Sequence, residues 1–179
     1  MLPPEQLHVT PVFVVPVTVA AQTDLAFMPD GGRAYLLALF DREPETVAGI
    51  VKARRGAAAW ETWLAARPDL KERERRTLAG YLSITMPLDG AAALQEKVAF
   101  ETALPPDGKQ LAVENCQFCH SFFTGYLTQS RDADGWRAIF KAPFHKEIRM
   151  TPAERETFAL YSAANMPLPT ETVPQELRY

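Results

Sequence analysis

The chain has 179 residues, of which 47% are hydrophobic and 23% are charged, and its formal net charge is −3. This length allows one large domain or two small ones, and the apolar content is sufficient for buried cores. The acidic balance argues against a nucleic-acid-binding protein, which usually carries a basic face. No apolar run reaches the length of a membrane span, so no transmembrane segment is expected.

Residues 1–27 carry β-branched residues and prolines without a helical period, so we expect an extended arm with at most a short edge strand. Residues 9–21 are apolar, but Pro11 and Pro16 interrupt them and no Lys or Arg precedes them. That pattern is untypical of a signal peptide, and we interpret the chain as already processed.

The remainder is predicted to be helical almost throughout, because capping residues precede segments with apolar residues at helical spacing. The expected helices cover residues 34–40, 44–54, 57–67, 71–84, 89–102, 108–115, 136–141 and 152–165. The last has the clearest start, with Thr151 as N-cap, Pro152 in the first turn and Glu154 completing a capping box. Prolines 105 and 106 mark a linker, and the proline-rich tail from Met166 is expected to be extended. The predicted fold class is all-α.

The sequence Cys116-Gln117-Phe118-Cys119-His120 carries the most specific chemistry in the chain. Two thiols at this spacing can each form a thioether with one of the two vinyl groups of a haem, and the adjacent His can bind its iron. A zinc site would need further Cys or His ligands, and the chain has no other cysteine. A thioredoxin-like pair should follow a strand, whereas this motif ends a predicted helix. The motif therefore predicts one covalently bound haem c.

Similar segments recur in the same order in the two halves of the sequence, which indicates an internal duplication. Residues 73–88 and 153–168 are identical at eight of sixteen positions, and both end in Met-Pro-Leu. Residues 28–31 resemble 105–108 at an offset of 77. At that offset, Leu39, Arg42 and Glu43 stand in the places of the two cysteines and the histidine, so the first copy cannot bind haem in the same way.

We therefore expect a haem-less first domain whose corresponding volume is filled by Phe40, Trp60 and Trp63. The predicted organisation is an arm at 1–27, a degenerate domain at 28–103 and a haem-binding domain at 104–179 with an extended tail.

The second half resembles class I-type c cytochromes, especially the small electron-acceptor domains attached to oxidoreductases and the di-haem cytochromes built as tandem copies. The residues that carry the resemblance are the motif at 116–120, then Gly135 and Trp136 after a polar loop, then the capped helix from Thr151 to Tyr161. The resemblance implies two cytochrome c-like domains, with haem bound covalently to Cys116 and Cys119 and with His120 as the proximal axial ligand. It also implies assembly outside the cytoplasm, in the bacterial periplasm.

The distal ligand, which in this family is usually Met and sometimes His, stays open between three residues. His145 lies between the Trp136 helix and the last helix, where the family usually has its ligand, and it is the favoured candidate. Met150 lies in the same loop but fits a hydrophobic staple before Thr151. Met166 precedes a proline, yet it follows the final helix. A His ligand would give a lower reduction potential than a Met ligand.

Aromatic residues are dense around the motif, and we expect Trp136 and Phe140 to line the haem pocket, with the Trp136 indole N–H available to a haem propionate. The resulting hypothesis is a mono-haem cytochrome that carries single electrons between redox partner proteins. A periplasmic dehydrogenase is one such partner, and the chain could be a subunit of an oxidoreductase complex. The alternative is a haem enzyme or a gas or redox sensor with an exchangeable distal ligand.

Overall fold

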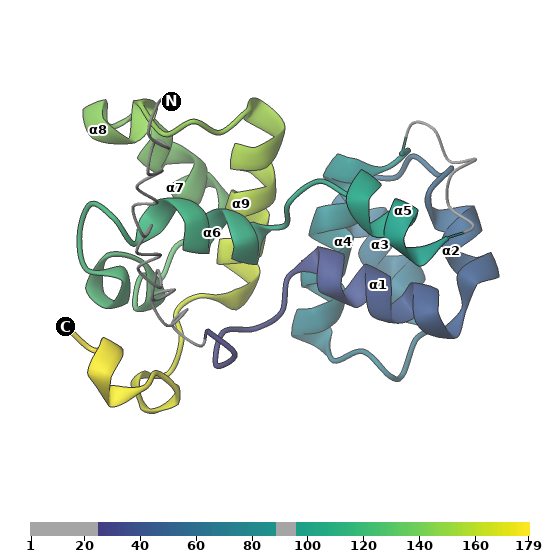
Figure 1. Ribbon diagram of the computed structural model, residues 1–179, viewed down its shortest axis with the longest axis horizontal. Coiled ribbons are helices and arrows are strands. Elements are labelled where there is room, and N and C mark those ends of the chain that lie inside the picture. The colour runs from purple at the N-terminus through teal and green to yellow at the C-terminus, as the bar shows by residue number, and fades with distance from the viewer. Residues whose placement is uncertain (1–24, 89–95) are drawn as a thin grey trace, which may run out of the picture.

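The computed structural model describes residues 25–88 and 96–179, and in these residues the fold is all-α, with no strand. The expected N-terminal arm lies outside the described residues except for its last three. The beginning of the helix expected at 89–102 also lies outside them. The described helices form two groups, residues 32–103 and residues 108–165, each around its own hydrophobic cluster (Figure 1).

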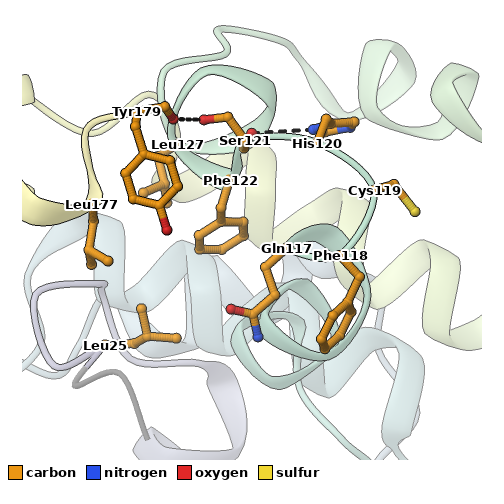
Figure 2. A pocket seen from close by; sticks show the side chains of 10 residues that line it. All are labelled: Leu25, Gln117, Phe118, Cys119, His120, Ser121, Phe122, Leu127, Leu177 and Tyr179. Carbon is orange, nitrogen blue, oxygen red and sulfur yellow. Dashed lines mark hydrogen bonds between the residues drawn. The ribbon is translucent and has the colours of Figure 1, made fainter. Parts of the chain in front are cut away.

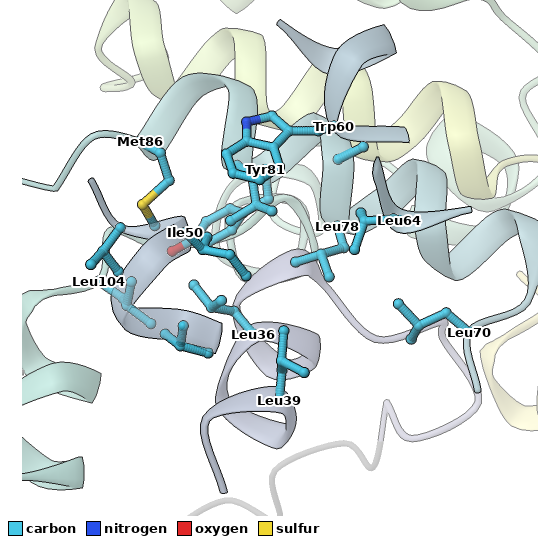
Figure 3. Close-up of a cluster of buried hydrophobic side chains, with 14 of the residues drawn as sticks. Leu36, Leu39, Ile50, Trp60, Leu64, Leu70, Leu78, Tyr81, Met86 and Leu104 are labelled. Atoms are coloured by element: carbon cyan, nitrogen blue, oxygen red, sulfur yellow. The ribbon is translucent and has the colours of Figure 1, made fainter. Parts of the chain in front are cut away.

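The first group consists of five helices packed around one core. They are α1 (Gly32–Arg42), α2 (Pro44–Ile50), α3 (Ala57–Leu64), α4 (Glu72–Thr85) and α5 (Lys97–Ala103). Leucines of α1, α3 and α4 meet Trp60 and Tyr81 in this core, and Phe100 of α5 is fully buried against it (Figure 3). Phe40 stacks on Phe100 with ring centres 4.8 Å apart.

The second group contains the motif and ends with the C-terminal tail. Its elements are α6 (Gly108–Cys116), the π-helical turn η2 (Phe123–Leu127), α7 (Ala133–Ala138), the 3-10 turn η3 (Ile139–Lys141), α8 (Pro143–Lys146) and α9 (Pro152–Asn165). The tail is not the extended arm that its prolines predicted. It forms two 3-10 turns, Thr170–Thr172 and Gln175–Leu177, and buries Leu168 and Val173 in the second cluster.

Capping residues determine where the best-defined helices begin. Thr151 accepts a hydrogen bond from the Glu154 N–H, the Glu154 side chain accepts one from the Thr151 N–H, and α9 begins at Pro152 as predicted. Asp107 and Gln110 form the same reciprocal box at the start of α6.

Two helices end earlier than their periodicity predicted. α2 ends at Ile50 rather than 54, and the Val51 carbonyl just beyond it accepts a hydrogen bond from the Leu88 N–H. The Val51 carbonyl is therefore engaged by a residue distant in the sequence, instead of by the backbone N–H four residues further on. α3 ends at Leu64 rather than 67, because the Arg67 N–H turns back to the Leu64 carbonyl in a tight turn before Pro68.

The groups are joined by the packing of α4 against α9 and by hydrogen bonds that cross between them. The Tyr81 hydroxyl donates to the Pro105 carbonyl at 2.8 Å, and the Tyr161 hydroxyl donates to the Pro29 carbonyl at 2.7 Å. Asn165 also donates to the Thr77 hydroxyl in a buried contact. Each tyrosine therefore holds the segment that leads into the other group.

Two close approaches lie in this junction. A β-carbon placed on Gly31 would overlap the Asp107 carboxylate, which accepts backbone hydrogen bonds from Gln110 of α6 and from Arg33 of α1. One carboxylate thus caps the starts of both helices. Where α4 meets α9, a β-carbon on Gly80 would lie 3.2 Å from Cβ of Leu160.

Candidate haem site

A cavity of about 430 Å³ opens beside the Cys-x-x-Cys-His segment. Both cysteines and His120 lie on its boundary, and so does His145. Its other walls are mostly apolar side chains of the second group, and they are Tyr126, Trp136, Ile139, Phe140, Phe144, Ile148, Met150 and Phe158, with Asn115, Gly125 and Arg131 as further lining residues. This volume and this mainly apolar lining are typical of a cofactor pocket.

The end of α6 positions the two cysteines. Cys116 is the last residue of α6 and is half-buried against the second cluster, whereas Cys119 lies in the following turn and is exposed. Burial, together with the nearby Cys119, raises the pKa of the Cys116 thiol to about 12. At neutral pH this free side chain is therefore a thiol rather than a thiolate.

The π-helical turn η2 follows the motif and packs against His120. A β-carbon on Gly125 of this turn would overlap the His120 Nδ1 atom, so only glycine leaves room for the ring. Short π-helical turns are frequent at functional sites. Neither this turn nor the contact of Gly125 with His120 was predicted from the sequence, where a glycine in the largely apolar stretch after the motif was the available signal.

His120 and His145 face the same cavity from different elements. Their ring centres are 6.2 Å apart, and their planes are inclined by 62°. His120 Nδ1 lies 3.2 Å from the Ser121 carbonyl, and His145 Nδ1 lies 3.1 Å from the Ile139 carbonyl. A carbonyl oxygen can only accept, so a ring that donates in this contact has its proton on Nδ1, and its Nε2 is then the nitrogen available to a metal.

This spacing fits a haem held between two imidazoles. Two imidazoles on opposite sides of one iron, each bound through a nitrogen at about 2 Å, have ring centres roughly 6 Å apart. His145 belongs to α8, whose start at Pro143 turns the chain back over the cavity. The structure therefore brings together the motif and the distal candidate that the sequence favoured, although they lie 25 positions apart.

The two methionine candidates differ in position. Met150 lines the cavity and is buried, so it lies in the same wall as His145. Met166 is buried in the second cluster after α9, and it is absent from the cavity lining. Of the three candidates for the distal ligand, His145 and Met150 therefore line the cavity and Met166 does not.

Trp136 and Phe140, which we expected to line a haem pocket, both lie in the wall of this cavity. The Trp136 Nε1–H is buried without a hydrogen-bond partner among the described residues, and an orphaned donor at a cavity wall is suited to a polar group of a bound ligand. The Arg131 guanidinium lies 5.7 Å from the centre of the Trp136 ring and also lines the cavity. Arg131 was not singled out from the sequence, where it is one charged residue in a polar loop.

A smaller hollow of about 340 Å³ adjoins the motif and shares Cys119 and His120 with the main cavity. Figure 2 shows it between Leu25, Phe122, Leu177 and Tyr179, with Phe118 and Cys119 at its edge. Tyr179 lies on its boundary, and the Ser121 hydroxyl donates to the Tyr179 carbonyl. The tail thus braces the turn that carries His120.

Among residues 25–88 and 96–179, no three His, Cys, Asp or Glu side chains converge in a way that could hold a bare metal ion. The same part of the chain contains no helix with the length and apolar character needed to cross a membrane. No family model, curated protein or solved structure matches the chain.

Proposed function

We propose that the chain is a mono-haem c-type cytochrome that carries single electrons between proteins. The observation that carries the proposal is that Cys116, Cys119, His120 and His145 surround one largely apolar cavity. The covalent motif and two imidazoles at a suitable separation are what a six-coordinate haem c needs, whereas a bare metal ion finds no converging ligand set in the described residues.

The residues have distinct roles in this proposal. Cys116 and Cys119 would attach the haem covalently, and His120 and His145 would be the ligands of its iron. When bound, the haem supplies reversible one-electron redox chemistry. The backbone carbonyls of Ser121 and Ile139 fix the imidazole tautomers, and the aromatic walls exclude water.

We also propose that the two groups of helices are copies of one cytochrome c-like domain. Contacts recur in pairs: a β-carbon on Gly32 would overlap Tyr81, and one on Gly108 would overlap Tyr161. Leu88 donates its N–H to the Val51 carbonyl, and Leu168 donates to the Leu127 carbonyl. An arginine also lies over a buried tryptophan in each group, Arg55 over Trp60 and Arg131 over Trp136. Such repeated contacts are what a duplication would leave.

These pairs favour an offset of 76 at the start of each copy, since Gly108, Leu127 and Trp136 follow their counterparts by that number. The equivalents of Cys116, Cys119 and His120 are then Phe40, Glu43 and Pro44, rather than the residues given by the offset of 77. Phe40 stacks on Phe100, and Glu43 pairs with Arg67. In this view the Phe100 ring of α5 occupies, in the first copy, the space that is a cavity in the second copy.

Attachment of haem c to cysteines implies assembly in the bacterial periplasm, so we propose that compartment and periplasmic redox proteins, including a dehydrogenase, as partners. The proposal also accounts for the first copy, which lacks haem and would be retained for packing and contacts.

The test is co-expression with a c-type haem maturation system, followed by denaturing electrophoresis with haem staining and a pyridine haemochrome spectrum. We expect one covalent haem with two thioether bonds and a low-spin oxidised spectrum. His145→Ala should become high-spin, and Met150→Leu should leave the spectrum unchanged. Cys116→Ser/Cys119→Ser is the matched control that should lose the stain.

A colourless chain with both thiols free, from cells that mature another cytochrome c, would refute the proposal. A high-spin spectrum in the unmodified chain would instead indicate an open distal position and would favour a haem enzyme or sensor. Loss of the low-spin form in Met150→Leu but not in His145→Ala would transfer the ligand role to Met150.

A further inference from the structure

The tail that follows α9 runs along the turn η2 and contacts the chain on both sides of it. The Leu168 N–H donates to the carbonyl of Leu127, the last residue of η2, at 2.8 Å. At the other end of the tail, the Tyr179 carbonyl accepts from the hydroxyl of Ser121, which lies just before η2. We call residues 168–179 the strap.

Apolar burial and internal hydrogen bonds hold the strap in this position. Val173 is 1% exposed within the second hydrophobic cluster, and Leu177 is half-buried against the same cluster. Leu177 and Tyr179 also line the smaller hollow together with Phe122 (Figure 2). The Arg178 Nε–H donates to the Val173 carbonyl at 2.8 Å and so closes the strap on itself. Removal of these apolar groups from water favours the bound position.

Ser121 connects the strap to His120. The Ser121 carbonyl lies 3.2 Å from His120 Nδ1, and it accepts a hydrogen bond from the Gly125 N–H at 2.8 Å. The Ser121 hydroxyl accepts a hydrogen bond from the Thr124 N–H at 3.2 Å and donates to Tyr179 of the strap. One serine therefore contacts the imidazole ring, the turn η2 and the strap.

The turn η2 limits where the imidazole ring can lie. A β-carbon on Gly125 would be only 2.1 Å from His120 Nδ1, so the backbone of η2 lies directly against the ring. This turn has five residues. A helical segment this short has little stability of its own, so the contacts at its two ends determine where it lies.

The first group of helices has a comparable arrangement. Both α4 and α9 are followed by Met-Pro-Leu, and the next helix of the first group, α5, returns to the end of α1. Phe100 of α5 stacks on Phe40, and Lys97 pairs with Asp41 at 2.6 Å. In both groups, a segment beyond Met-Pro-Leu thus packs near the end of the first helix of its own group.

We propose that the strap positions the His120 ring through Ser121, which makes Ser121 a positioning residue for the proximal ligand. The proposal rests on the proposed function, because it assigns a task to the tail at the same haem site. With the strap in place, the Ser121 carbonyl and the backbone of η2 hold the imidazole in one orientation. When the strap is displaced, η2 loses the contacts at both of its ends and the ring becomes free to turn.

The first experiment measures amide hydrogen exchange in the haem-free chain by NMR. Leu177→Asp places a carboxylate where the strap packs against the cluster, so the strap should detach. We expect the Thr124 and Gly125 amides to exchange at least about tenfold faster, because both donate to Ser121. Gln175→Asp is the matched control, since it adds the same charge at an exposed position of the strap, and it should leave both rates within about twofold.

The second experiment examines the ring itself, by EPR of the oxidised, haem-loaded chain. The g values of a low-spin haem depend on the orientation of its axial rings, which neighbouring groups fix. Ser121→Ala removes the hydroxyl that bonds to Thr124 and Tyr179, and it should shift or broaden the g values. Ser121→Thr keeps a hydroxyl and should restore the signal, and Gln175→Asp should leave it unchanged.

Equally fast exchange in Gln175→Asp, or unchanged exchange in Leu177→Asp, would overturn the proposal, and so would unchanged g values in Ser121→Ala. If Leu177→Asp accelerates the α9 amides to the same degree, it has unfolded the whole group, and the g values of the two Ser121 variants then decide.

The two proposals fail in different ways. A chain that takes up no haem but shows the local acceleration in Leu177→Asp would refute the proposed function, while the contact of the strap with η2 would stand. Haem uptake with a low-spin spectrum, but without that acceleration, would refute the strap alone.

Discussion

The two groups of helices differ in how their interiors are occupied. In the first, Phe40 and Phe100 stack within a core that fully buries Leu36, Leu64 and Leu78. The second instead has a cavity of about 430 Å³ with two cysteines and two histidines on its boundary. The difference teaches that a small group of helices can either fill its interior with stacked rings or enclose a cavity between its side chains.

The largest expected effect comes from emptying the filled core. Phe100→Ala should reduce the free energy of unfolding by about 3–5 kcal/mol, because a fully buried ring is removed and a cavity is left. Phe144→Ala is the matched control in the second group and should change it by less than about 0.5 kcal/mol, since that ring is exposed. Urea unfolding of the haem-free chain measures both, and a small loss in Phe100→Ala would show that the first core is not tightly packed.

A second experiment tests whether the two groups share their closest helix contacts. Gly32→Ala and Gly108→Ala should each cost about 1–3 kcal/mol, because the added methyl group would overlap Tyr81 or Tyr161. Gly49→Ala, whose β-carbon would meet no atom within 4 Å, should instead stabilise the chain by up to about 1 kcal/mol. Thermal unfolding separates the three variants, and a large cost at only one of the paired glycines would argue against matching packing.

The hydrogen bonds that cross between the groups provide a smaller and more specific comparison. Tyr81→Phe and Tyr161→Phe each remove one hydroxyl that donates to a carbonyl in the segment leading into the other group. Each should cost about 1 kcal/mol. If only one variant is destabilised in urea unfolding, the two crossing contacts are not equivalent.

The smallest effect concerns pH. Burial raises the pKa of Asp107, against the opposing backbone hydrogen bonds from Gln110 and Arg33. The fold then takes up a proton more readily than the unfolded chain, so the contribution of Asp107 is greatest at low pH and is lost as pH rises from about 4 through the folded pKa.

Asp107→Asn keeps a capping side chain that cannot titrate. Relative to this variant, the natural chain should lose free energy of unfolding between pH 4 and pH 7 in urea titrations. A relative gain over that range would contradict the raised pKa.

Local patterns predicted much of this fold, and tertiary contacts explain the rest. Thr151, Pro152 and Glu154 determine the start of α9 through bonds within four residues, so the sequence alone was sufficient. The end of α2 depends on Leu88, more than thirty residues away, and periodicity could not detect it. The tail after Met166 was wrongly expected to extend, because prolines exclude regular helices but do not show which core will bury Leu168 and Val173.

The candidate site likewise has features that local sequence predicts and features that depend on tertiary contacts. The motif at 116–120 can be recognised from spacing, because its chemistry is contained in five consecutive residues. His145 could be favoured but not chosen from sequence, since its distance from His120 depends on how α7, η3 and α8 turn the chain back. The contact of Gly125 with the His120 ring and the place of Arg131 beside Trp136 become visible only in three dimensions.

The junction between the groups also has a consequence for self-association. Gly31 faces Asp107, and Gly80 faces Leu160, so a small residue meets a large one at both points. In the duplication that we propose, Gly31 is the counterpart of Asp107 and Gly80 is the counterpart of Leu160. Two second groups arranged in this manner would then force two carboxylates, and likewise two leucines, into space that holds one. Two first groups would leave both helix starts without the shared carboxylate cap. The surfaces therefore select the unlike partner within the same chain and disfavour a homodimer of either group.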